Sequence, residues 1–310
     1  MPVWVQNFYV TTVNTSLKTK GNTMYKIGAD PELFAFDKVK GSYISVHNLL
    51  TGTKKNPVPV DQGAVQVDGT AAEFNIMPAE TMGQFVARIE LVRNRIQSII
   101  QQKNPNVVLV GQPWVEYSQD YWEKIPKKYK ELGCDPDYNA YTGEINPRPD
   151  PEKLGRPSLR TGSGHIHIGW LDPRAQRNED THFLDCRLVV KAMDKILLPV
   201  YEHYFDQDKV RRELYGKPGA FRPKPYGVEY RVLSNKWVTD PEATRVVYAY
   251  TNMIMWTLNY FGRTMRLGER EDQIPEAFNA LLRYCATNYG FMTEVYNVVK
   301  KYPLSRVKKV

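Results

Sequence analysis

The 310-residue sequence is poor in cysteine and has no long apolar stretch. Its three cysteines, Cys134, Cys186 and Cys285, lie far apart and lack the paired spacing of metal ligands. This argues against a disulfide framework or a zinc site and favours a reducing, cytoplasmic environment. No run of about 18 apolar residues occurs, so we expect no membrane-spanning helix. Residues 1–20 lack a basic start followed by an apolar core, so we expect no secretory signal.

The composition is that of a globular protein, with 42% hydrophobic and 25% charged residues. The net charge of +8 is unevenly distributed. Residues 209–236 contain eight basic and two acidic residues, and residues 300–310 add five basic residues and no acid. The first cluster contains prolines, glycines and aromatics, and it suits a polyanion, either a nucleoside triphosphate or a nucleic acid. We interpret the second as a solvated tail.

The order of predicted strands and helices does not alternate regularly. This favours an α+β protein with an antiparallel sheet over a doubly wound one. We expect residues 1–23 to be an N-terminal extension or arm, and residues 24–310 to be a single domain that includes a C-terminal helical part. The predicted strands cover 26–36, 43–47, 64–67, 71–76, 107–110, 161–170 and 227–233. The predicted helices cover 79–102, 178–205, 240–261, 275–286 and 292–302, with a turn-rich region at 113–157 and a basic loop at 209–225.

The first strong strand carries two acids on one face. Side chains alternate along a strand, so Asp30 and Glu32 point the same way. Burying two such carboxylates is unfavourable unless a cation or a proton intervenes. A solvated acidic turn would also explain this stretch. Pro31 cannot donate to a β-ladder, which predicts a strand start or an edge.

Three later strands repeat this pattern of one apolar face and one ionisable face. Glu73 shares a face with Asn75, His165 with His167, and Glu229 with Arg231. Oxygen ligands with some nitrogen suit Mg²⁺ or Mn²⁺ better than zinc. Arg222 and Arg231 have the geometry to clamp phosphate oxygens. Together these features predict a concave sheet that binds divalent cations and phosphate, as phosphoryl transfer requires.

Each motif also has an ordinary structural explanation. A His-x-His strand is often structural or a zinc ligand pair. A Glu-x-Arg strand often forms a cross-strand ion pair. The Asp68-Gly69 pair predicts a hairpin turn, in which Asp68 is either a turn residue or a ligand or base. The joint pattern, rather than any single motif, favours a metal and phosphate site.

Several of these stretches are similar to a known enzyme superfamily. Residues 28–37 resemble the strand of glutamine synthetase that carries two metal-binding carboxylates around a proline. Residues 164–167 resemble the His-x-His strand of glutamine synthetase and of glutamate–cysteine ligases, and residues 229–231 resemble the late Glu-x-Arg strand. With 67–73, 133–139 and 219–228, the set resembles the phage-encoded COOH–NH2 ligase type 2 family, a branch of the glutamine synthetase-like carboxylate–amine ligases, over roughly residues 26–256. Asp30 departs from the usual, longer glutamate.

The resemblance implies a curved antiparallel β-sheet funnel flanked by long α-helices. It further implies an ATP- and Mg²⁺- (or Mn²⁺-) dependent ligase that forms an amide through an acyl phosphate. Its substrates would be small-molecule or peptide carboxylates and amines, in the host cytoplasm if the chain is phage-encoded. The resemblance does not identify the two substrates or the oligomeric state.

The resemblance also implies roles for individual residues. The implied metal ligands are Asp30, Glu32, Glu73, His165 and Glu229. His167, Arg222 and Arg231 would face the phosphates of ATP, and Arg222, Arg231 and Asp68 would take part in catalysis. The implied substrate collar comprises Asp135, Asp137, Tyr138, Asn139 and Arg160, with Arg160 for a carboxylate and Asp135 or Asp137 for an ammonium.

Two alternatives remain open at this point. One is a guanidino-type phosphotransferase on the same scaffold, which fold analogy does not exclude. The other is a basic nucleic-acid-binding or virion-associated protein that retains the site as a relic.

Overall fold

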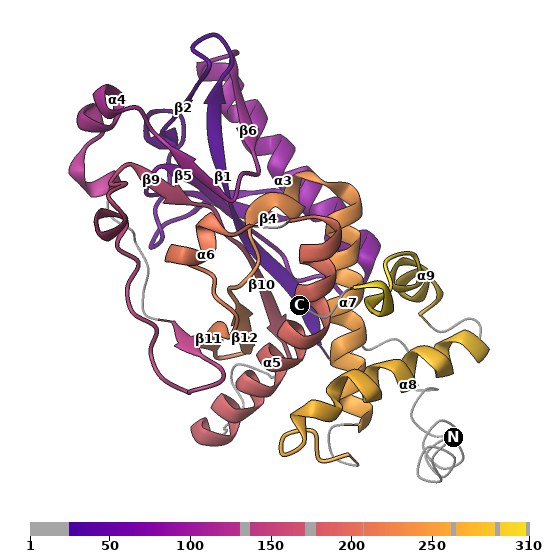
Figure 1. Ribbon diagram of the computed structural model, residues 1–310. Coiled ribbons are helices and arrows are strands. Elements are labelled where there is room, and N and C mark those ends of the chain that lie inside the picture. The colour runs from indigo at the N-terminus through magenta and orange to yellow at the C-terminus, as the bar shows by residue number, and fades with distance from the viewer. Residues whose placement is uncertain are drawn as a thin grey trace.

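The computed structural model describes residues 25–130, 137–170, 178–206, 208–261, 265–288 and 292–307 (Figure 1). The predicted N-terminal arm, residues 1–23, lies outside the described residues, and so do Cys134 and Asp135. None of the helices in the described ranges is both long and apolar enough to cross a lipid bilayer.

A ten-stranded sheet, antiparallel at every paired edge described, forms the centre of the fold. Its main path has the order β3-β4-β5-β1-β10-β12-β11-β8, and β2 and β6 also pair with β1. The strands are β1 (Lys26–Asp37), β2 (Ser42–Ile44), β3 (Val58–Val60), β4 (Gly63–Asp68), β5 (Ala71–Ile76), β6 (Val107–Val110), β8 (Tyr138–Asn139), β10 (Gly164–Gly169), β11 (Ala220–Lys224) and β12 (Gly227–Tyr230). A separate two-stranded sheet joins β7 (Trp114–Glu116) to β9 (Leu159–Thr161).

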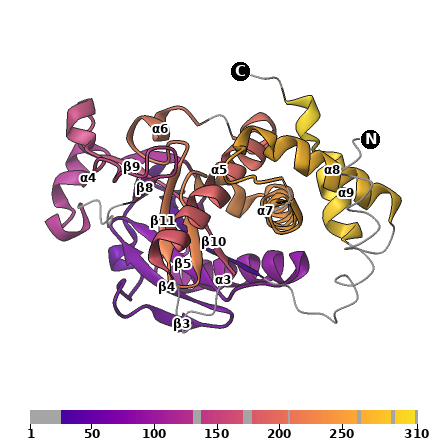
Figure 2. The same cartoon turned by 90° about the horizontal axis from the view of Figure 1, so that it is seen from below.

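Helices cover one face of this sheet. Helices α3 (Met82–Lys103), α5 (Glu179–Tyr204) and α7 (Pro241–Phe261) contact its strands, and α7 contacts both other helices. Helices α8 (Ile274–Thr287) and α9 (Thr293–Lys301) lie on the side of α7 away from the sheet (Figures 1 and 2). The shorter helices are α4 (Gln119–Lys124), α6 (Val210–Leu214) and the 3-10 turns at Val46–Asn48, Lys127–Tyr129, Pro151–Leu154, Asn235–Thr239, Glu271–Gln273 and Leu304–Arg306.

Residue alternation along β1 explains why the helices pack on this face. Ile27, Ala29 and Leu33 are buried in the main hydrophobic core, together with residues from all five long helices. The intervening residues, including Asp30 and Glu32, point to the opposite face. The predicted antiparallel sheet with long flanking helices is thus confirmed in a mixed α/β fold, while the funnel shape stays a prediction.

The position of Pro31 corrects one expectation. Pro31 lies in the middle of β1 and in the centre of the sheet, rather than at a strand start or an edge. The backbone of Ile27 forms hydrogen bonds with Ala79 on one edge of β1. Every second residue of a strand directs its N–H toward the same edge, so the nitrogen of Pro31 also faces this edge. There, the β1–β5 register covers only Glu32 and Leu33 within the described strands. Pro31, which has no backbone N–H, therefore lies where β1 is not paired with β5 in the described strands.

The segment 209–225, expected to be a loop, instead contains α6 and β11. Strand β11 pairs with β12 along Phe221–Lys224, but with β8 only at Ala220 and Phe221. Arg231 donates its backbone N–H to the carbonyl of Ala220, so Ala220 directs its backbone groups toward β12. Pro223, three residues on, directs its nitrogen toward the opposite edge of β11, where β8 has already ended and no hydrogen bond is lost. The turn-rich region 113–157 likewise contains β7, α4 and β8.

Candidate active site

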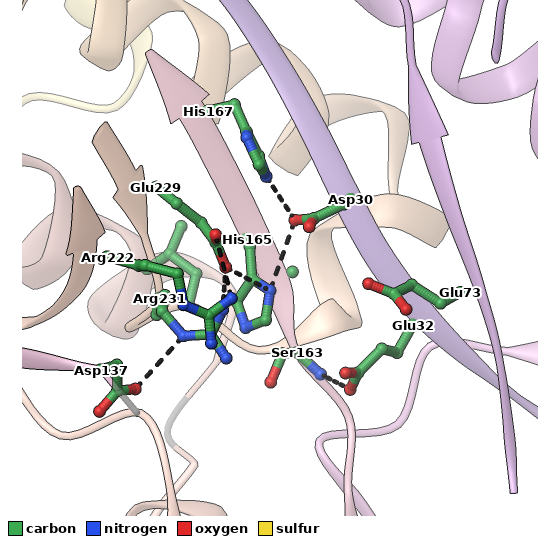
Figure 3. A network of polar contacts seen from close by, with 12 residues as sticks. Asp30, Glu32, Glu73, Asp137, Ser163, His165, His167, Arg222, Glu229 and Arg231 are labelled. Carbon is green, nitrogen blue, oxygen red and sulfur yellow. Dashed lines mark hydrogen bonds and ion pairs between the residues drawn. The ribbon is translucent and has the colours of Figure 1, made fainter. Parts of the chain in front are cut away.

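The strand register gathers the ionisable side chains into one row across the sheet. Four antiparallel ladders place acids, imidazoles and a guanidinium directly opposite one another on neighbouring strands. Figure 3 shows the carboxylates of Glu32 and Glu73 on one side of Asp30, and the imidazoles and Glu229 on the other. The opposed pairs are Glu32 with Glu73, Asp30 with His165, His167 with Glu229, and Glu229 with Arg222.

Asp30 lies between the two imidazoles of β10. Its Oδ1 is 2.9 Å from Nε2 of His167 and 3.4 Å from Nδ1 of His165. The same His165 nitrogen is 3.5 Å from Oε1 of Glu229. One ligand atom each from Asp30, His167 and Glu229 lies within 4.8 Å of the other two. Side chains from three different strands therefore converge on one point.

Glu229 is fully buried and is surrounded by cations. Its Oε2 is 2.7 Å from Nζ of Lys224 and 3.4 Å from Nη1 of Arg222. Its Oε1 contacts Nη1 of Arg231. A buried carboxylate needs such pairing. Three cations exceed what the Glu229 carboxylate alone requires, and Arg231 is also paired with Asp137.

The pair formed by Glu32 and Glu73 is unfavourable without a cation. Directly opposed like charges destabilise an antiparallel pair. The backbone N–H of Ser163 donates to Oε2 of Glu32 (2.8 Å), and the amide of Gln66 donates to Glu73. Burial and the charge of Asp68 nevertheless raise the pKa of Glu32 to about 8. Burial and three neighbouring acids raise the pKa of Glu73 well above its ordinary value.

The pKa shifts on the imidazole side run in the opposite direction. Burial alone would raise the pKa of Asp30, but the Coulomb attraction of His167 and other contacts with the imidazoles hold it well below 3.8. Burial, aided by the charge of Arg231, lowers the pKa of His165 to about 3. His165 is therefore neutral at physiological pH, which is the form that binds metals.

The arrangement fits a divalent cation. Asp30 Oδ1, His165 Nδ1 and His167 Nε2 are buried and contact one another and Glu229, without a hydrogen bond to any other group among the described residues. Buried polar atoms whose contacts stay within one such cluster are uncommon in folded proteins, and a cation shared between them would satisfy them. A mixed carboxylate and imidazole set beside a second pair of carboxylates suits Mg²⁺ or Mn²⁺. The structure places His167 beside Asp30 and Glu229, and the role predicted for it, facing the phosphates of ATP, stays a prediction.

Asp137 contacts a guanidinium rather than standing alone at a rim. Its Oδ2 is 3.2 Å from Nε of Arg231, and its Oδ1 accepts a hydrogen bond from the amide of Asn146 (3.0 Å). Arg231 is therefore held by Glu229 at one nitrogen and by Asp137 at another. This fixes the plane of the guanidinium. The role predicted for Asp137, binding a substrate ammonium, stays a prediction.

The remaining predicted collar residues make structural contacts. Tyr138 packs against Phe183 and Phe221, and Asn139 accepts hydrogen bonds from the backbone of its own turn. Arg160 is buried and donates to three backbone carbonyls. Its Cζ atom lies 4.2 Å from the centroid of the Trp122 ring. These contacts hold the surrounding loops together, and the role predicted for Arg160, binding a substrate carboxylate, stays a prediction.

Sequence reasoning missed several residues that support the site. Lys224 contacts Glu229, and the hydroxyl of Tyr226 contacts Nδ1 of His167. Buried Arg211 donates to the hydroxyl of Ser163 and to nearby backbone carbonyls. A signal was present for Lys224, because it is two residues from Arg222 and so shares its strand face. No comparable signal existed for Arg211, whose contacts depend on tertiary packing.

A family comparison agrees with this geometry. Residues 159–281 match the family described as phage phiEco32-like COOH.NH2 ligase-type 2. The chain is similar to this ligase family over that segment. The resemblance predicted from the sequence is thereby confirmed there. Among the curated proteins, none matches the chain.

The ligase-like segment, residues 159–281, carries only part of the site. It includes β10, β11 and β12, and therefore both imidazoles, Glu229 and the cations around it. It also extends through α7 into α8, farther toward the C-terminus than the sequence motifs indicated. Strands β1 and β5, with Asp30, Glu32 and Glu73, lie outside the match and are joined to the segment by strand pairing.

Proposed function

We propose that this protein is an ATP- and Mg²⁺-dependent carboxylate–amine ligase that forms an amide through an acyl phosphate. The observation that carries the proposal is the convergence of Asp30, His167 and Glu229 on one point, with two arginines beside it. The similarity of residues 159–281 to a COOH.NH2 ligase family supports the same reaction class.

In the proposed reaction, a substrate carboxylate oxygen attacks the γ-phosphorus of ATP and ADP leaves. An amine then attacks the acyl carbon, its proton is lost, and phosphate departs. Arg222 and Arg231 would bind oxygens of the transferred phosphoryl group, since guanidinium donors match phosphate geometry. Arg231 is already oriented for this by Asp137. Such fixed donors stabilise developing charge without reorganising.

The acids and imidazoles would hold the cations. Asp30, His167, Glu229 and the nearby His165 would form one site, and Glu32 and Glu73 a second beside it. When bound, divalent cations neutralise charge on the phosphate oxygens. Added positive charge would stabilise the ionised form of Glu32 and Glu73, because burial and neighbouring acids raise the pKa of both carboxyls. The site is thus built to gain stability from metal.

The nucleic-acid alternative loses part of its support in the folded chain. Of the basic residues in 209–236, Arg211 and Arg231 are buried, and Arg222 and Lys224 are directed at Glu229. A non-specific nucleic-acid surface needs exposed cations that can reach phosphates. Half of the cluster is therefore buried or paired with an internal carboxylate, while Lys209, Lys217 and Lys236 remain exposed.

The experiment that tests the proposal is a phosphate-release screen with pools of acids and amines, followed by mass spectrometry of the products. The expected result is release of phosphate that requires ATP, Mg²⁺, an acid and an amine, together with an amide product. Phosphorylation of a guanidino compound without amide formation would instead indicate the phosphotransferase. Salt-sensitive DNA binding with no binding of ATP would indicate the nucleic-acid-binding protein.

A further inference from the structure

Lys224 occupies a position that neither the family motifs nor the proposed roles explain. Its Nζ lies 2.7 Å from Oε2 of Glu229, while the Glu229 carboxylate is also one of the three groups at the candidate metal point. A monovalent ammonium and the expected divalent cation would therefore bind the same carboxylate. Like charges that share one ligand compete for it.

The three cations around Glu229 are held to different degrees. Arg231 is anchored on both Glu229 and Asp137. Arg222 lies directly opposite Glu229 in the β11–β12 ladder. Lys224 forms an ion pair with Glu229, and its side chain remains one-quarter exposed. Lysine also carries a compact charge on a flexible four-carbon chain, unlike the planar guanidinium.

We propose that Lys224 is a displaceable counter-ion of Glu229 that becomes a phosphate-binding residue when metal binds. Its ammonium neutralises Glu229 in the metal-free protein. A divalent cation held by Asp30, His167 and Glu229 repels the ammonium, which then turns toward the phosphate oxygens. This rests on the proposed function, because it requires the metal and the phosphate to share this site.

The proposal has a thermodynamic consequence with two opposite signs. Because Lys224 competes with metal, removing its charge tightens metal binding in the absence of nucleotide. Because Lys224 also binds phosphate, removing its charge weakens nucleotide binding once metal is present. A residue that merely supports the fold would weaken both, and a residue that only binds phosphate would leave metal binding unchanged.

The test compares Lys224→Met with the wild-type chain by titrating Mn²⁺ alone, with free Mn²⁺ followed by electron paramagnetic resonance. We expect the Kd for Mn²⁺ to fall roughly three- to tenfold, the scale of one partly buried charge interaction. ADP is then titrated at saturating Mn²⁺. Its Kd is expected to rise roughly tenfold, the size of one charge-assisted hydrogen bond.

The chain offers a matched control in Lys191→Met. Lys191 also forms a 2.7 Å ion pair, with Glu271, and its side chain is 11% exposed, but this pair joins α5 to the Glu271–Gln273 turn. Neither Kd should change in this variant. Lys224→Arg keeps the charge and should stay close to the wild-type Mn²⁺ affinity. Lys224→Gln provides a second neutral variant, and thermal unfolding confirms that each protein is folded.

The outcomes separate this proposal from the proposed function. Mn²⁺ binding that is unchanged or weaker in both neutral variants overturns the counter-ion role, while the ligase proposal stands. Tighter Mn²⁺ binding with an unchanged Kd for ADP overturns the transfer to phosphate. A wild-type chain that binds no Mn²⁺ overturns the metal part of the proposed function, and this proposal with it.

Discussion

Asn235 holds the backbone of Glu32 across 203 positions of sequence: its side-chain amide donates to the Glu32 carbonyl at 2.7 Å. Asn235 is fully buried and follows β12, at the start of the turn that leads to α7. This bond fixes β1, which carries Asp30 and Glu32, against the turn that follows β12, the strand that carries Glu229.

Asn235→Leu removes this bond and leaves a buried carbonyl without its donor. We expect the free energy of unfolding to fall by about 1–3 kcal/mol. Mn²⁺ binding should weaken as well, because Glu32 loses its backbone support. Chemical denaturation and Mn²⁺ titration measure the two effects. Asn288→Leu, at an exposed amide near the end of α8, is the control, and equal effects at both positions would contradict the prediction.

Glu229→Gln should abolish metal-dependent ATP turnover, because it removes the charge shared by the candidate metal point and three cations. It should also destabilise the fold by about 2–4 kcal/mol, since those cations lose their buried counter-charge. The double variant Glu229→Gln, Lys224→Met restores part of the charge balance. Its melting temperature should recover while turnover stays absent. Near-normal turnover in the single variant would exclude Glu229 from the metal site.

Stability of the metal-free protein should depend on pH through Glu32 and Glu73. Burial and neighbouring acids raise the folded-state pKa of Glu32 from 4.5 to about 8, and they raise that of Glu73 in the same direction. The folded state therefore keeps protons that the unfolded state releases. Between about pH 4.5 and pH 8, the free energy of unfolding should fall as pH rises.

Glu32→Gln should flatten this pH dependence and stabilise the metal-free protein at pH 8 by about 2–4 kcal/mol, at about 1.4 kcal/mol per unit of pKa shift. Mn²⁺ should stabilise the wild type more than the variant. Denaturation at several pH values, with EDTA or with Mn²⁺, measures both effects. Glu90→Gln, on the exposed side of α3, is the surface control. An equal pH slope in wild type and Glu32→Gln would refute the assignment.

Arg160→Met tests whether this arginine binds substrate or holds structure. Its guanidinium donates to three backbone carbonyls and stacks on Trp122. We expect a loss of about 1–3 kcal/mol in stability, from carbonyls left without donors. The KM for the acid substrate should change little. A large rise in KM with an unchanged melting temperature would instead restore the substrate-collar role inferred from family resemblance.

The sequence sufficed for features that depend on local periodicity. Alternation along 26–36 predicted that Asp30 and Glu32 share a face, and the register of β1 with β10 and β5 then brings them to the row of ionisable groups. Helices α3 and α5 followed from apolar residues at helical spacing, and α7 from its Asp-Pro-Glu opening. The structure adds the N-caps Thr81 and Asn178.

What the sequence could not predict depends on pairing between distant segments. Arg231 and Asp137 are 94 positions apart, and nothing local in either segment encodes their contact. Pro223 made β11 hard to predict, because proline has no backbone N–H to donate to a neighbouring strand. No hydrogen bond is lost at Pro223, because β8 is too short to reach it. The structural role of Arg160 depends on the carbonyl of Lys130, in a loop that sequence patterns do not place.

The position of β1 in the middle of the sheet has a consequence for how the site comes into existence during synthesis. The strand that supplies Asp30 emerges early from the ribosome, but its partner β10 follows more than a hundred residues later, and β12 later still. Until then the nascent chain carries its acids without the imidazoles that complete the metal point. The site therefore assembles in one late event, and fragments cut at the boundaries of the ligase-like segment would contain half of it.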